Sequence, residues 1–197
     1  MKTAIVNGSE ISAEAVEFEL DRLVKFYANH GMTVDEVKAN LPKLQAKALD
    51  QAIGAKLLLD RSRQLELPVS AKDVDAEVAR VVAQIGGEEN YRRALAAQGV
   101  SEADFRKELE KGARVNLLVN QVCAQVGEPT EAEVEAFYQA HREEYAKESK
   151  TLVDAHDQIK DLLRHAARGR AVDVFVEELR ESATIVYKEV PGRRAKA

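Results

Sequence analysis

The sequence has no tryptophan and few aromatic residues. Only 5% of its 197 residues are aromatic, whereas 32% are charged. Ala, Val, Leu, Glu, Lys and Arg dominate, and this mixture favours helices with solvated outer faces. Hydrophobic residues still make up 45% of the chain, which is enough for one or two domains with a real core rather than a disordered chain.

The chain has a single cysteine, Cys123, which excludes an intramolecular disulfide framework and a metal site built from several cysteines. It lies in the apolar helical stretch NLLVNQVCAQV, so we expect a buried small side chain rather than a reactive thiol. No segment approaches the roughly 18 apolar residues that a membrane span requires. The first residues, MKTAIVNG, lack the apolar core of a signal peptide, so the chain is expected to be cytosolic or a mature exported protein whose signal has been replaced by a starting Met.

Positive charge is outnumbered: 29 Lys and Arg stand against 34 Asp and Glu, for a net charge of −5. This balance argues against a general nucleic-acid binder. The basic end, GRRAKA, is too short to change that conclusion and is expected to be solvated and frayed.

The residue patterns of common catalytic and metal sites are also missing. No His-Glu-x-x-His pair, Cys/His cluster, Gly-rich phosphate loop or Gly-x-Ser-x-Gly occurs. His141 and Glu144 are three apart and are expected on a solvated helix face. His156 lies between Asp154 and Asp157, which could raise its basicity, although a surface position in a charged helix is the better explanation. We therefore predict no catalytic residue, no metal site and no cofactor.

Strands are predicted at both ends of the chain. Ala4–Val6, the pair Asn7-Gly8 and Glu10-Ile11 form the pattern of a β-hairpin, because Asn-Gly favours a two-residue type I′ turn. The end, ATIVYKEV, alternates polar and apolar residues around β-branched side chains, as strands do. A lone hairpin is marginal in water, so the late strand is expected to pair with the early AIV strand.

Helices are predicted between these strands. In the first, residues Val16, Leu20, Leu23 and Tyr27 share one face, and Gly31 ends it. Later helices start at capping-box patterns, in which an acid follows a hydroxyl residue by three positions: Thr33/Glu36, Ser70/Asp73, Ser101/Asp104 and Thr130/Glu133. With Pro and Gly as boundaries, the predicted ranges are 34–40, 43–66, 71–85, 88–98, 102–125 and 131–145.

The stretch REEYAKESKTLVDAHDQIK contains neither Gly nor Pro, so one long helix or two helices could form there. Thr151 and Asp154 repeat the cap pattern, and AKESK is polar enough to turn, so we favour two helices that meet at residues 146–151. The second is predicted over 151–168, with apolar Val172, Phe175, Val176 and Leu179 beyond Gly169. The fold class is mostly α, with a small β-element formed by the N-terminal hairpin and the C-terminal strand.

The order of these elements resembles a known family. The segments VNGSEIS, LDQAIGAKLLLDRSRQLELPVSAKDVDAEVARV, YRRALAAQGVSEADFRKELEKGARVNLLVNQV and PTEAEVEAFYQAHREEYA are similar to the SurA-like bacterial periplasmic chaperones, which include SurA, PrsA and PpiD. Residues 3–146 follow the N-terminal chaperone domain, and residues 151–189 look like the helix and strand that complete it. The resemblance implies one chaperone domain built from 1–146 and 151–197.

The chain departs from the family at 146–151. There the resemblance implies a parvulin peptidyl-prolyl isomerase domain, but only AKESK is present, and the parvulin SHIL, Gly-rich and GYH segments are missing. The seam is therefore interpreted as the site of an absent insert, through natural loss or engineered deletion. The chain is accordingly expected not to be an enzyme, although its family is often described as peptidyl-prolyl isomerases.

The resemblance further implies reversible, ATP-independent binding of unfolded or partly folded polypeptides, with exported or outer-membrane proteins as clients. Candidate binding residues are apolar side chains of the 71–110 segment, for which core packing is the competing interpretation: Val82, Ile85, Tyr91, Leu95 and Phe105. A structural module is the alternative function, in which a homodimer swaps the C-terminal helix and strand. Location in the periplasm or cell envelope is expected from the resemblance, with the cytoplasm as the alternative.

Overall fold

The computed structural model describes residues 2–189, within which it has eight helices and three strands. The C-terminal GRRAKA segment lies outside the described residues. The chain divides into two compact units, which are described separately: unit 1 comprises residues 1–118 and 176–197, and unit 2 comprises residues 119–175. The mostly helical fold class with a small β-element is confirmed.

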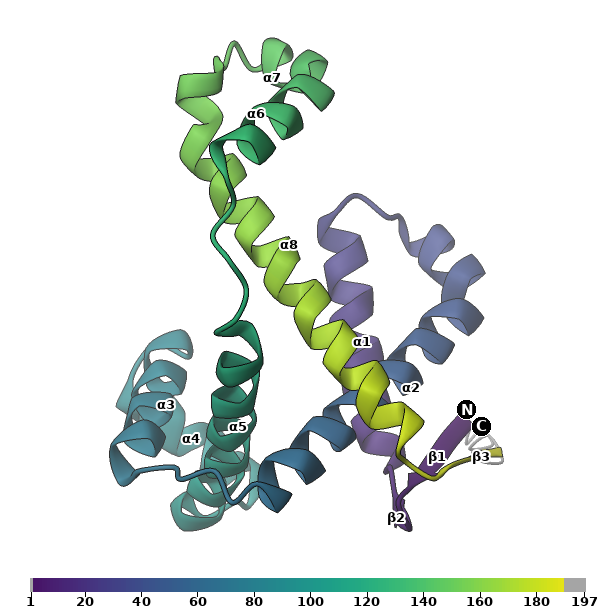
Figure 1. The fold of residues 1–197 in the computed structure, drawn as a ribbon. Coiled ribbons are helices and arrows are strands. Elements are labelled where there is room, and N and C mark those ends of the chain that lie inside the picture. Colours follow the sequence, from purple (N-terminus) through teal and green to yellow (C-terminus); the bar gives the residue numbers. More distant parts are fainter. Residues whose placement is uncertain (1, 190–197) are drawn as a thin grey trace. The chain divides into compact units, whose positions relative to one another are not determined.

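Both chain ends contribute to the sheet of unit 1. Strand β1 (Lys2–Val6) pairs antiparallel with β2 (Ser9–Glu10) on one side and with β3 (Ile185–Glu189) on the other, where Ala4 faces Tyr187 (Figure 1). The turn residues Asn7 and Gly8 have φ values of 48° and 80°, as a type I′ turn requires. The Asn7 side chain also accepts a hydrogen bond from Thr184 N at 2.9 Å, which fixes the approach to β3. The predicted pairing of the two chain ends is confirmed.

Helices α1 (Ala13–Asn29) and α2 (Val34–Gln64) pack against each other and enclose the main core of unit 1. The predicted face of α1 turns inward, since Val16 is fully buried and Leu23 nearly so. On α2, Ile53 is fully buried, and Gly54 lies where an added Cβ would come within 3.3 Å of the Val176 side chain. A helical glycine is unfavourable by itself, so its place here is explained by this close approach.

The predicted break of α2 at Pro42 is wrong. The helix continues through Pro42, although proline removes one backbone hydrogen bond and normally kinks or ends a helix. Val37 before the proline and Leu44 after it both pack on the same core. Tertiary packing on both sides therefore holds the two halves in one helix. The capping box at its start, Thr33 with Glu36, is present as predicted.

Three further helices follow in the chain: α3 (Ala71–Gln84), α4 (Glu88–Gln98) and α5 (Glu102–Cys123). Ser70 and Asp73 form the predicted capping box of α3, and Asp104 N donates to the Ser101 hydroxyl at the start of α5. Helix α4 ends at Gly99, which adopts the left-handed conformation expected of a helix-terminating glycine. All three lie within a residue or two of their predicted ranges.

Unit 2 contains α6 (Glu131–Ala140), α7 (Arg142–Lys147) and most of α8 (Leu152–Glu181). Its core consists of Val134, Ala155 and Ile159, with partly buried aromatic and aliphatic side chains around them. The prediction of one helix over 131–145 is wrong, because the chain breaks at His141. The His141 Nδ1–H donates to the Phe137 carbonyl at 2.9 Å and its ring stacks on Phe137, so the side chain ends α6 locally.

The two-helix prediction at the seam is confirmed. Helix α7 ends at Lys147, Ser149 adopts a left-handed φ of 55°, and α8 begins at Leu152. Thr151 N donates to the Asp154 carboxylate at 2.9 Å, as the cap pattern predicted. The Tyr138 hydroxyl donates to the Lys150 carbonyl at 3.1 Å and secures the turn. Helix α8 runs past Gly169 to Glu181 rather than ending at 168.

Candidate polypeptide-binding surfaces

Four of the five predicted binding residues lie on α3, α4 and α5, and the fifth, Ile85, directly follows α3. Tyr91 is only 3% exposed, and its ring meets that of Phe105 edge-on with centroids 5.7 Å apart. Val82, Leu95 and Phe105 are half-buried, and Ile85 is 37% exposed. The structure therefore brings Tyr91 and Phe105 together as packing partners and leaves Ile85 as the candidate with most surface to offer.

The Tyr91 hydroxyl is a special feature of this helix group. It is buried and has no hydrogen-bond partner within residues 2–189. Burial raises the pKa of Tyr91, the Glu102 carboxylate raises it further, and the Arg106 guanidinium opposes the change. Arg106 itself is ion-paired with Asp75, which joins α5 to α3. The Tyr91 hydroxyl therefore stays neutral and remains a buried polar atom without a partner among residues 2–189.

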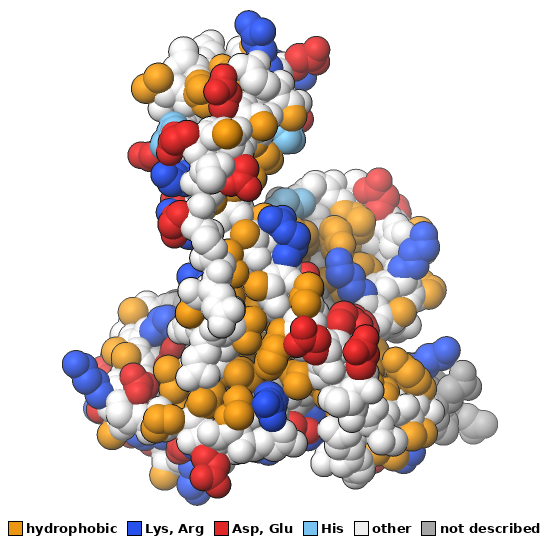
Figure 2. Space-filling view, viewed as in Figure 1, with side chains coloured by type: hydrophobic (Ala, Val, Ile, Leu, Met, Phe, Trp, Pro, Cys, Tyr) orange, Lys and Arg blue, Asp and Glu red, His pale blue; other side chains and the backbone are white. Residues whose placement is uncertain are grey.

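A second surface, which the sequence did not predict, is the α1–α2 groove. It is an open depression of about 460 Å³, lined by Arg22, Leu23, Lys25 and Phe26 from α1 and by Lys47 and Gln51 from α2. Phe26 is 53% exposed and stacks on His30 with ring centroids 4.1 Å apart. Figure 2 shows apolar side chains at the surface over α1 and α2, with Lys and Arg side chains among them. The sequence contains one indication of this groove, because Phe26 lies outside the helix face that Leu23 and Tyr27 share and is therefore expected at the surface.

Charged groups of unit 2 are arranged differently, around the start of α6. His156 Nε2 lies 2.7 Å from a Glu131 carboxylate oxygen, and His156 Nδ1 lies 2.9 Å from Asp157. Carboxylates accept hydrogen bonds, so both ring nitrogens donate. The hydrogen bonds to Asp157 and Glu131 accordingly raise the pKa of His156. Of the two neighbouring aspartates in the sequence, only Asp157 contacts the ring, because Asp154 caps α8; the second partner is Glu131, which the sequence did not suggest.

The same carboxylate of Glu131 also accepts from Lys160 at 3.1 Å. Hydrogen bonds from His156 and Lys160 lower the pKa of Glu131. One turn further along α8, Arg164 pairs with Glu128 at 2.6 Å beside a depression of about 280 Å³ lined by Val126, Pro129 and Leu163, among others. These ion pairs tie the chain before α6 to α8, and they are exposed.

Residues with the chemistry of a metal or redox centre do not gather in the described part of the chain. Among residues 2–189, no three His, Cys, Asp or Glu side chains are placed to hold a metal ion. Cys123 is buried, as predicted, with its Sγ 3.8 Å from the Arg168 carbonyl. No helix formed by residues 2–189 combines the length and apolar character needed to cross a membrane.

Comparison with known proteins gives three results. The model of the SurA-like N-terminal domain matches residues 1–122. The foldase protein PrsA of Clostridium acetobutylicum is 22% identical over 170 residues, which cover 84% of this chain and 50% of that protein. The chain thus spans about half the length of this curated relative.

The third result is structural. A chain from the study of PEB4 and Cj1289, described as two structurally related SurA-like chaperones of Campylobacter jejuni, superposes with a TM-score of 0.57 at 12% identity. The match covers 95% of this chain and 99% of the other. At this identity the match shows a shared fold.

Proposed function

Because the chain belongs to the SurA-like N-terminal domain family, we propose that it is an ATP-independent chaperone that binds unfolded or partly folded polypeptides. The observation that carries this proposal is the exposed apolar surface of the part matched by the family model. Six large apolar side chains there are at least 37% exposed: Phe18, Phe26, Val34, Leu41, Leu65 and Ile85. Single exposed apolar residues are ordinary, but this number in one unit offers several weak contacts to an unfolded chain.

The physical basis of such binding is burial of apolar surface without sequence-specific hydrogen bonds. Each contact removes apolar area from water at roughly 25 cal/mol per Å², so several shallow contacts combine into reversible binding. We place one contact region on α3–α5, where Ile85 is exposed and Val82, Leu95 and Phe105 are half-buried. Tyr91 supports this surface from below through its contact with Phe105.

We place the activity in the periplasm or cell envelope, with exported or outer-membrane proteins as clients. The structural match comes from a study of two related SurA-like chaperones, of which Cj1289 is described as periplasmic, and this supports the location. The family resemblance therefore favours the envelope.

We further propose that residues 1–146 and 151–197 act as one chaperone domain without prolyl isomerase activity, and that the seam marks the place of an absent parvulin insert. In support, only Glu148–Thr151 separate α7 from α8. Backbone and side-chain hydrogen bonds close this turn locally, including Lys150 N to the Tyr145 carbonyl at 3.0 Å. This chain should not accelerate the refolding of a test protein whose rate is limited by prolyl cis/trans isomerisation.

The decisive test is suppression of aggregation. A chemically unfolded outer-membrane protein is diluted into buffer with increasing amounts of the chain, and light scattering is followed. We expect suppression near equal molar amounts. Ile85→Ser should weaken it, whereas Val153→Ser, a matched change at an exposed residue of unit 2 outside the family match, should not. No suppression by a chain that is folded and helical by circular dichroism would contradict the proposal.

The alternative is a structural module that dimerises by exchange of α8 and β3. The observation that favours it is the long sequence separation of the β1–β3 pair, because the same pairing could form between two chains. Light scattering coupled to size-exclusion chromatography separates the two functions. A stable dimer without any suppression of aggregation would support the structural module.

A further inference from the structure

The α1–α2 groove combines an apolar floor with an unusual lining. Of the six residues that line it, three are cationic and none is acidic: Arg22, Lys25 and Lys47 are the cations. This sign is opposite to that of the whole chain, whose net charge is −5. A depression of about 460 Å³ falls in the size range of ligand sites and can admit one or two large side chains.

The cations of the groove differ in how far they are neutralised. Arg22 donates to Glu19, with the shorter contact at 2.8 Å, so its charge is largely balanced. Lys47 Nζ donates to the Tyr27 hydroxyl at 3.1 Å and lies 5.5 Å from the centre of that ring, which leaves its charge without a carboxylate partner. Lys25 forms no ion pair with any residue between 2 and 189. Two ammonium groups are thus available, one on each helix.

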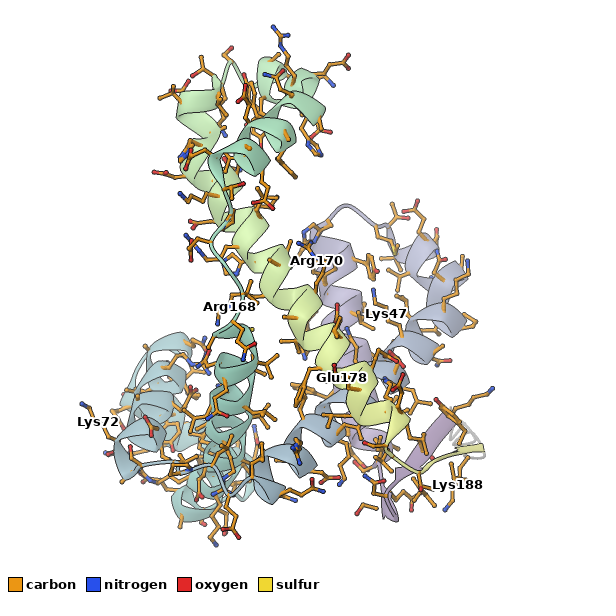
Figure 3. All side chains as sticks on the ribbon, in the orientation of Figure 1. Lys47, Lys72, Arg168, Arg170, Glu178 and Lys188 are labelled. Carbon is orange, nitrogen blue, oxygen red and sulfur yellow. The ribbon has the colours of Figure 1, made fainter. Side chains whose placement is uncertain are left out.

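The apolar part of the groove is formed by α1, which also carries Lys25, while Lys47 lines the groove from α2. Leu23 is nearly buried and forms the floor, while Phe26 is half-exposed and presents its ring beside it. A ligand that fits must therefore bring an apolar side chain and carboxylates close together. Figure 3 shows Lys47 at the α1–α2 pair, well away from Lys72 on α3 and from Lys188 on β3.

We propose that this groove binds segments of unfolded polypeptide in which a large apolar side chain is flanked by Asp or Glu. The apolar side chain contacts Leu23 and Phe26, and the flanking carboxylates pair with Lys25 and Lys47. Charge complementarity selects this occupant over a neutral or basic apolar segment. The inference rests on the proposed chaperone function and adds a sequence preference that apolar surface alone would not give.

The test uses short fluorescently labelled peptides and the whole chain, with binding followed by fluorescence anisotropy. One peptide has a Phe-Leu centre flanked by Glu, a second has Lys in place of Glu, and a third keeps Glu but has Ser in place of Phe-Leu. The acidic apolar peptide should bind most tightly, and its affinity should fall as salt approaches about 0.15 M, where screening is strong.

Two charge-matched variants assign the effect to the groove. Lys25→Gln with Lys47→Gln should weaken binding of the acidic apolar peptide about fivefold, in line with exposed ion pairs. Lys72→Gln with Lys188→Gln changes the net charge equally at sites outside the groove and should leave the affinity unchanged. Phe26→Ser should weaken binding of the acidic and basic apolar peptides alike, because it removes the contact both would share.

The outcomes separate this proposal from the chaperone function. Equal affinity for acidic and basic peptides, or equal losses in both double variants, would overturn the acidic preference while aggregation is still suppressed. Self-association that Lys25→Gln with Lys47→Gln abolishes would show a second copy in the groove and also overturn it. Failure to suppress aggregation, with acidic peptides still bound by the groove, would refute only the chaperone proposal.

Discussion

The two units of the molecule are stabilised by different means. Unit 1 has eleven buried hydrophobic residues in one cluster, drawn from the sheet, α1 and α2, whereas the cluster of unit 2 has three. Unit 2 adds exposed ion pairs between the chain around the start of α6 and helix α8, and a hydrogen bond from Tyr138 across the seam. Apolar burial is insensitive to pH, whereas ion pairs of this kind depend on it.

The comparison shows that the buried apolar side chains of this chain are concentrated in unit 1. Because the buried cluster of unit 1 is large, this unit stays folded although other large apolar side chains lie exposed on its surface. In unit 2, helix caps and ion pairs supplement a small apolar cluster, and each of these interactions needs only two or three residues. We therefore expect core substitutions to act on both units, but a rise in pH above 6.5 to act mainly on unit 2, which contains His156.

The largest expected effects come from truncating one fully buried isoleucine in each unit. Ile53→Ala and Ile159→Ala each remove a similar volume, and such changes cost about 2–5 kcal/mol. In unit 1 the remaining cluster should keep α1 and α2 folded at lower stability. In unit 2 the loss should unfold α6 and α7 locally. Hydrogen exchange read by mass spectrometry distinguishes these outcomes segment by segment.

Leu162→Ala provides the control for these substitutions, because Leu162 is 50% exposed on the same helix as Ile159. Its effect should stay within about 0.5 kcal/mol. If Ile159→Ala lowered protection in β1 as strongly as in α6, the two apolar clusters would not stabilise their units independently.

A smaller effect is expected from removing equivalent helix caps. Thr130→Ala breaks the capping box of α6, which has 10 residues, and Thr33→Ala breaks that of α2, which has 31. Loss of a capping hydroxyl costs about 1 kcal/mol. That amount should lower protection throughout α6, whereas α2 should only fray at its first turn. Hydrogen exchange of both helices measures the difference, and Thr130→Ser, which keeps the hydroxyl, should behave like the wild type.

Local signals in the sequence predicted much of this fold. The Asn7-Gly8 turn, the pairing of the late strand with β1 and the capping pairs each depend on residues whose chemistry is fixed by their spacing. The break at the seam was predicted for the same reason, because Thr151 and Asp154 form a cap without help from the rest of the chain.

Features that depend on tertiary contacts could not be predicted in this way. Helix α2 passes through Pro42 because packing on both sides outweighs a local preference. The end of α6 at His141 is a local effect of its contact with Phe137, but no Gly, Pro or capping pair marks it in the sequence. The binding residues show the same limit. Tyr91 was a candidate as an apolar residue of the 71–110 segment, with core packing as the competing interpretation, and the structure shows that it is buried. The sequence gave no reason to look for cations around Phe26.

The smallest expected effect is a pH dependence of unit 2 near neutral pH, which depends on His156. Hydrogen bonds to Asp157 and Glu131 raise the pKa of His156 above its ordinary value of 6.5 in the folded state. A group with a raised pKa stabilises the fold fully below its unfolded value, and this contribution is lost as pH rises through the folded value. Protection of α6 should therefore decrease as pH rises above 6.5, after correction for the intrinsic exchange rate.

His156→Gln should remove that dependence, and His165→Gln, at an exposed position on the same helix, should keep it. Glu131 makes the stability of unit 2 depend on pH in the acid range. Hydrogen bonds from His156 and Lys160 lower its pKa below 4.5, so its contribution is present above that value and is lost as pH falls through the lowered one. The cluster should thus stabilise unit 2 most between these two limits. A pH dependence of equal size in β1 and α2 above pH 6.5 would show that a titrating group also supports unit 1 in this range, which would remove the contrast between the units.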